Sequence, residues 1–174
     1  MAELTYIHGD PRIDEEGTEM FDTLVRGGQV VCAGNTVEAE VGIKDGRIAA
    51  LLGRGVEARA NQVIDASDKV VIPGVIDAHF HFSMASGSKG DSFETSAISA
   101  AYGGVTTLIP FIEVPPDAHL GEFLDSFLWA GGRTSVLDFA MHCWPHAPDR
   151  RRIAQIPDAI ALGVTSFKAF MAYR

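Results

Sequence analysis

Cysteines, basic clusters and long apolar runs are scarce in this sequence, and each scarcity excludes a class of protein. Only two cysteines, Cys32 and Cys143, occur among 174 residues, and they lie far apart. Neither a disulfide scaffold nor a Cys-x-x-Cys site is therefore expected, and two free thiols favour a reducing, cytoplasmic location. No apolar run reaches the roughly 18 residues that cross a bilayer, and the polar N-terminus is unlike a secretory signal, so we expect no membrane association.

Basic residues are outnumbered, because 14 Lys and Arg face 23 Asp and Glu and give a net charge of −9. The one basic block is the arginine triplet at 150–152, which we interpret as the solvated start of a helix. Nucleic acid is therefore not an expected partner. With 47% hydrophobic residues, the composition is that of a globular chain with a real core.

The sequence divides into three parts that differ in composition and in the pattern of apolar residues. Residues 1–20 are polar and acidic and are predicted to form a flexible extension. Residues 21–70 contain short strand-like runs separated by glycine turns, including Asp45-Gly46, and predict a small, incomplete β-sandwich module. Residues 71–174 alternate apolar strands with helices. The expected strands there are 105–112, 135–142 and 164–173. The expected helices are 93–102, about 120–130 and 151–162, the last interrupted or begun near Pro157.

Nearly continuous apolar strands joined by helices predict a parallel sheet with right-handed crossovers. In such sheets functional groups gather at the carboxyl ends of the strands. Polar residues that fall at or near those ends are His79, His81, Glu113, His142 and Lys168. We therefore expect these side chains to converge on one face.

The central stretch is residues 70–81, an apolar run that reads as one buried strand and ends in a His-x-His pair. On a strand, side chains two residues apart share a face, so His79 and His81 can reach one metal ion. For an isolated His-x-His pair, the alternative is two histidines that bond to loop backbone.

Lys168 lies in a second apolar strand, where an unpaired ammonium would cost several kcal/mol. A buried lysine tends to lose its proton, and the neutral amine is a nucleophile that can capture carbon dioxide as a carbamate. The alternative is a lysine that snorkels from the strand end or pairs with a carboxylate.

Together these motifs resemble those of a known family. Residues 73–81 are similar to the metal-binding signature of the amidohydrolase superfamily. Residues 103–107 and 163–173 are similar to the cyclic amidohydrolases, which include hydantoinases, dihydropyrimidinases, allantoinases and dihydroorotases. The resemblance runs from about residue 21 to residue 174.

The resemblance implies an α/β fold in which residues 71–174 form strands 1–4, the first half, of a (β/α)8 TIM barrel. It assigns His79 and His81 to the more buried of two divalent ions, with zinc expected, and Lys168, carboxylated at N6, to the bridge between them. It implies ring-opening hydrolysis of hydantoins or dihydropyrimidines by a metal-bridging hydroxide. Tyr173, which occupies the position typical of hydantoinases and dihydropyrimidinases, is then the catalytic residue that stabilises the oxyanion.

Other members of the family remain alternatives. Allantoinase is the nearest, a dihydroorotase-like enzyme is disfavoured because no arginine follows His81, and a non-catalytic dihydropyrimidinase-related scaffold would tend to lose metal ligands that this chain keeps. The family pattern also needs two further histidines and an aspartate on later strands. We therefore expect a truncated form that is inactive alone, a homotetramer in full-length form, and structural roles for His142 and His146.

Overall fold

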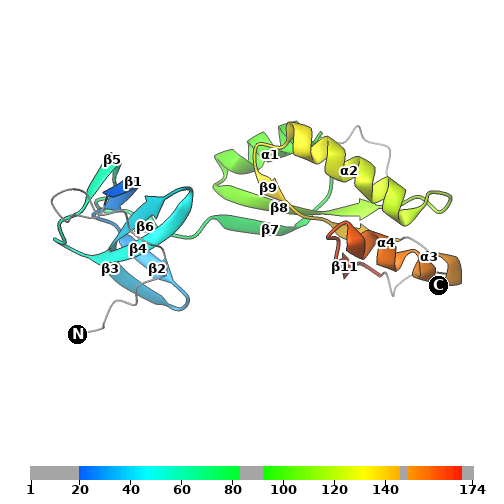
Figure 1. The fold of residues 1–174 in the computed structure, drawn as a ribbon, viewed down its shortest axis with the longest axis horizontal. Coiled ribbons are helices and arrows are strands. Elements are labelled where there is room, and N and C mark those ends of the chain that lie inside the picture. The colour runs from blue at the N-terminus through cyan, green and yellow to red at the C-terminus, as the bar shows by residue number, and fades with distance from the viewer. Residues whose placement is uncertain (1–19, 83–91, 146–148, 170–174) are drawn as a thin grey trace. The chain divides into compact units, whose positions relative to one another are not determined.

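The structure, a computed structural model, describes residues 20–82, 92–145 and 149–169. The chain divides into two compact units, Met1–Pro73 and Gly74–Arg174. Each unit has its own sheet (Figure 1), and the two are considered separately below. The predicted extension at 1–20 lies almost entirely outside the described residues.

The first unit is built of strands in the order β5-β1-β3-β2-β6, with β4 paired to β3. The pairs that involve β3 are antiparallel, whereas β1 pairs with β5 and β2 with β6 in parallel. The expected hairpin is present, since Asp45 and Gly46 both adopt positive φ between β3 and β4. The strands are β1 Met20–Arg26, β2 Gln29–Cys32, β3 Asn35–Lys44, β4 Arg47–Gly53, β5 Arg59–Asp65 and β6 Val70–Val71.

Two small apolar clusters fill the first unit. One contains Phe21 and Leu24 of β1 with Leu52 of β4, and the other centres on Val30 and Val41.

The second unit carries a parallel sheet in the order β11-β10-β8-β7, with β9 also paired to β8. The predicted parallel arrangement is confirmed, and the fold is mixed α/β. Its elements are β7 Val75–Phe80, α1 Phe93–Tyr102, β8 Val105–Glu113, α2 Leu120–Thr134, β9 Asp138–Phe139, β10 His142–Trp144, α3 Arg150–Ala154, α4 Ile156–Ala161 and β11 Ser166–Phe167.

The core of the second unit lies between the sheet and its helices. Leu108 and Ile112 of β8 are buried, and Ile112 packs with Leu120 and Leu124 of α2 in the main cluster. Phe111, between them in sequence, belongs to the opposite face of β8 by the alternation of strand side chains. That opposite face carries the candidate site.

Several predicted boundaries are wrong in this unit. Helix α2 continues through Gly131 and Gly132, because its buried face keeps packing to that point. The helix expected at 151–162 is interrupted near Pro157, as predicted, and forms α3 and α4, whereas the strand expected at 135–142 is two short strands. In the portion of the chain that the structure describes, no helix has the length and apolar character to span a membrane.

The stretch at 70–81 is not one buried strand. Pro73 and Gly74 separate β6 in the first unit from β7 in the second, because proline has no amide hydrogen to continue a ladder. Strand β7 is also largely exposed in this chain, with Ile76 at 62% of its full exposure. The apolar composition of β7 predicted that this strand would be buried. It is exposed because, among the described strands, it pairs with β8 alone.

The arginine triplet is not fully solvated either. Arg152 is 5% exposed, and its guanidinium donates to the carbonyl oxygens of Val114 and Pro115. These bonds tie α3 to the end of β8. A charge run in the sequence therefore contains one residue with a structural role.

Candidate functional site

The predicted site residues gather around one aromatic ring, that of Phe111 on β8. The ring centroids of His79, His81 and His142 lie 4.9, 5.2 and 4.7 Å from its centroid. The Nζ atom of Lys168 lies 4.1 Å from the same centroid. The structure thus brings together His79, His81, His142 and Lys168, as predicted, although His142 begins β10 instead of ending the expected strand at 135–142.

The two histidines of β7 lie side by side. Their ring centroids are 5.6 Å apart, and His81 follows the last residue of the strand. The pKa of His81 is lowered, chiefly by burial and then by the positive charges of Lys168 and His79, while Glu113 opposes the shift. A lowered pKa favours the neutral imidazole, the form that has a lone pair for a metal ion.

Lys168 is half-buried and lies just after the short strand β11, so it is not inside a long buried strand as expected. Its backbone amide donates to the carbonyl of Cys143 at 2.8 Å, which continues the pairing with β10. Its Nζ atom lies over the rings of Phe111 and Trp144, at 4.1 and 5.5 Å from the centroids. This geometry favours a cation above either ring.

Both ring nitrogens of His142 are engaged within the chain. Nδ1 lies 2.5 Å from the Oγ of Ser166, and Nε2 lies 3.2 Å from the carbonyl oxygen of Ala78. A ring whose two nitrogens bond to protein is unsuited to bind metal, which agrees with the structural role expected for His142. His146 and Tyr173 lie outside the described residues.

Among the described residues, no group of three or more His, Cys, Asp and Glu side chains is placed to hold a metal ion. The histidine pair supplies two nitrogen donors. A third donor from the described residues would therefore have to come from a residue other than His, Cys, Asp or Glu. Lys168 is the residue at hand, since its amine lies against the same Phe111 ring as both histidines.

A cavity of about 380 Å³ opens beside His81. Its wall is mainly aromatic and apolar, with one carboxylate. A flat, weakly polar molecule would suit such a wall. This lining was not predicted from the sequence, although aromatic residues near strand ends could have indicated it. The lining includes Phe82, Phe111, Glu113, Pro115, Phe127 and Trp144.

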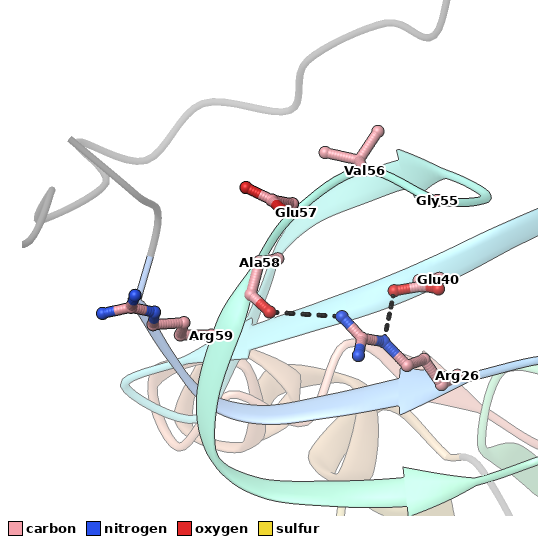
Figure 2. A pocket seen from close by; sticks show the side chains of 7 residues that line it. All are labelled: Arg26, Glu40, Gly55, Val56, Glu57, Ala58 and Arg59. Atoms are coloured by element: carbon pink, nitrogen blue, oxygen red, sulfur yellow. Dashed lines mark hydrogen bonds and ion pairs between the residues drawn. The ribbon is translucent and has the colours of Figure 1, made fainter. Parts of the chain in front are cut away.

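The first unit has a cavity of about 460 Å³ with a different character, shown in Figure 2. There Arg26 donates through Nε to Glu40 at 2.8 Å and through Nη2 to the carbonyl of Ala58 at 3.1 Å. Arg59 and Glu57 also line it. The inner charges already satisfy one another, so this arrangement ties strands together and offers little for a ligand.

Comparison with known proteins finds relatives that are named hydantoinases or allantoinases. No protein-family model matches it. A D-hydantoinase of Streptomyces coelicolor is 38% identical over 157 residues, which are 87% of this chain and 34% of that protein. An allantoinase of Rubrobacter xylanophilus is 37% identical over 156 residues, with 87% and 33% covered.

Solved structures agree with the sequence comparison. A D-hydantoinase from a Bacillus species superposes with a TM-score of 0.78 at 32% identity, over 87% of this chain and 34% of that one. Sequence and structure comparisons both find hydantoinases, which confirms the resemblance to the cyclic amidohydrolases. The chain spans about a third of the length of the relatives it matches.

Proposed function

We propose that this chain forms part of a metal-dependent hydrolase of cyclic amides, with a hydantoin or dihydropyrimidine ring as substrate. The observation that carries the proposal is the convergence of His79, His81 and Lys168 on the ring of Phe111. The names of the relatives, D-hydantoinase and allantoinase, support the reaction class. Residues 74–174 are proposed as the first half of a TIM barrel, preceded by a β-sandwich module.

The residues present fit a metal centre. His79 and His81 offer two neighbouring imidazoles, and the lowered pKa of His81 keeps its lone pair available near neutral pH. Lys168, carboxylated, would add an anionic oxygen donor to the two imidazoles. When bound, two divalent ions, with zinc expected, supply Lewis acidity and lower the pKa of a water molecule toward about 7.

The chain's own residues have defined tasks in this proposal. His79 and His81 hold their ion from the end of β7, and the apolar wall of Phe82, Phe127 and Trp144 orients a flat ring and limits water. Tyr173 is proposed to donate a hydrogen bond to the developing oxyanion.

The test is metal analysis of the purified full chain together with turnover of hydantoin, dihydrouracil and allantoin. We expect bound zinc or a similar ion in the unmodified chain. Lys168→Ala should lose the second ion, because Lys168 is the residue proposed to bind both ions. Lys69→Ala, at an exposed lysine of the first unit, is the control and should keep the metal content unchanged. Equal metal content in Lys168→Ala and the unmodified chain would contradict the assignment.

Allantoinase is the second candidate, because the Rubrobacter relative is nearly as similar as the first hydantoinase. Relative turnover of allantoin and hydantoin distinguishes the two. A chain that binds no metal would instead favour a non-catalytic relative that keeps the fold.

A further inference from the structure

The hydrogen bonds of His142 define its tautomer. A carbonyl oxygen only accepts, so Nε2 carries the proton and donates it to Ala78 at 3.2 Å. Nδ1 is then the acceptor in the neutral ring, and the hydroxyl of Ser166 donates to it at 2.5 Å. Both neighbours are therefore bound by one imidazole of fixed orientation.

These two bonds connect strands that are not neighbours. The sheet order is β11-β10-β8-β7, so His142 on β10 lies beside Ser166 on β11 but is separated from β7 by β8. In the register His142 lies opposite Phe111 on one side and Ser166 on the other. The imidazole stacks on the Phe111 ring at an interplanar angle of 26° and passes across β8 to Ala78.

The ladder between β7 and β8 is irregular at the point where His142 attaches. Its register shifts between Asp77 and Phe80, which brackets both Ala78 and His79. Regular pairing does not fix this stretch, so the bond from His142 is a separate restraint on the backbone just before His79. At the other end, Ser166 precedes Lys168 by two residues and so shares its face of the strand.

We propose that His142 is a positioning residue, which sets the separation between the histidine pair at the end of β7 and Lys168, just after β11. This inference rests on the proposed metal site and adds a residue to it. An imidazole that bonds one carbonyl beside His79 and one hydroxyl beside Lys168 holds both strand ends against the Phe111 ring. Partners that orient metal ligands in this indirect way typically contribute about 10- to 100-fold to metal affinity.

The test uses the ¹⁵N-labelled full chain and Co²⁺ as the probe. In the unmodified chain we expect a protonated Nε2 and an unprotonated Nδ1 for His142. His142→Phe keeps the stacking on Phe111 and removes both hydrogen bonds. It should shift the ring signals of His79 and His81 and weaken Co²⁺ binding by about 10- to 100-fold. His119→Phe, the same change on the helix side of the unit, should alter neither.

A milder pair of variants covers the possibility that His142→Phe does not fold. Ser166→Ala removes the donor to Nδ1, whereas Ser166→Thr keeps a hydroxyl, so Thr should restore the His79 and His81 signals that Ala disturbs. Unchanged signals and Co²⁺ affinity in folded His142→Phe, or in Ser166→Ala if the former does not fold, would overturn the inference. If the unmodified chain binds no Co²⁺, the metal proposal fails, while the ring signals still decide the positioning role.

Discussion

The two units use polar side chains in opposite ways. In the first unit, Glu40 and Arg26 satisfy each other, and Arg26 also bonds the carbonyl of Ala58, so the charges close a structural network. In the second unit, His79, His81 and Lys168 gather at strand ends around Phe111 and beside a cavity. Position at the carboxyl ends of parallel strands, together with an adjacent apolar wall, is what distinguishes the candidate site from the structural network.

If each unit has its own core, truncating a core side chain should destabilise that unit alone. This is the largest effect that we expect. Leu24 in the first unit and Leu124 in the second are both fully buried. Leu24→Ala and Leu124→Ala should each cost about 2–5 kcal/mol, because each leaves a cavity. Amide hydrogen exchange should show the loss of protection in the altered unit only. Equal loss in both units from either variant would mean that they unfold together.

The structural network of the first unit gives the next largest effect. Glu40→Gln weakens the bond to Arg26, whose side chain is 39% exposed and can recover water, so we expect a loss of about 1–2 kcal/mol in denaturant unfolding. The matched control is Glu38→Gln, because Glu38 and Arg54 form an exposed pair that should contribute only about 0–0.5 kcal/mol. Equal losses in both variants would remove the distinction between the network and a surface pair.

The smallest effects concern the two thiols. Burial raises the pKa of Cys143 to about 11, against a partial opposing effect of the Arg152 charge. Cys143 should therefore resist a thiol reagent at pH 8 in the folded chain, whereas half-buried Cys32 should react first.

The same shift has a defined sign for stability. Above pH 9 the unfolded thiol ionises while the folded one stays protonated up to about 11, so this group's contribution to the free energy of unfolding falls as pH rises through that window. Cys143→Ser should flatten the fall in a pH series of denaturant midpoints. An equally steep fall in that variant would assign it to other groups.

Much of the second unit follows from local patterns. Helix α1 begins at Phe93 because Ser92 and Thr95 form a capping box, a feature of neighbouring residues alone. Gly163 ends the helical segment with positive φ, which glycine adopts without strain. Strand β8 follows from its run of β-branched and apolar residues. Boundaries failed where packing decided them, as in α2, whose Gly131 accommodates the ring of Phe139 and so remains within the helix.

The sequence by itself determined the alternation of strands and helices, the parallel sheet, the family, and which polar residues stand at strand ends. Periodicity, turn residues and motif spacing are local properties and can be read from the sequence alone. Only the tertiary structure decided that these residues meet at the ring of Phe111 and that His142 spans from β10 to Ala78. It also decided that β7 is exposed. Those facts depend on register and on which strands lie side by side, and no local pattern encodes either.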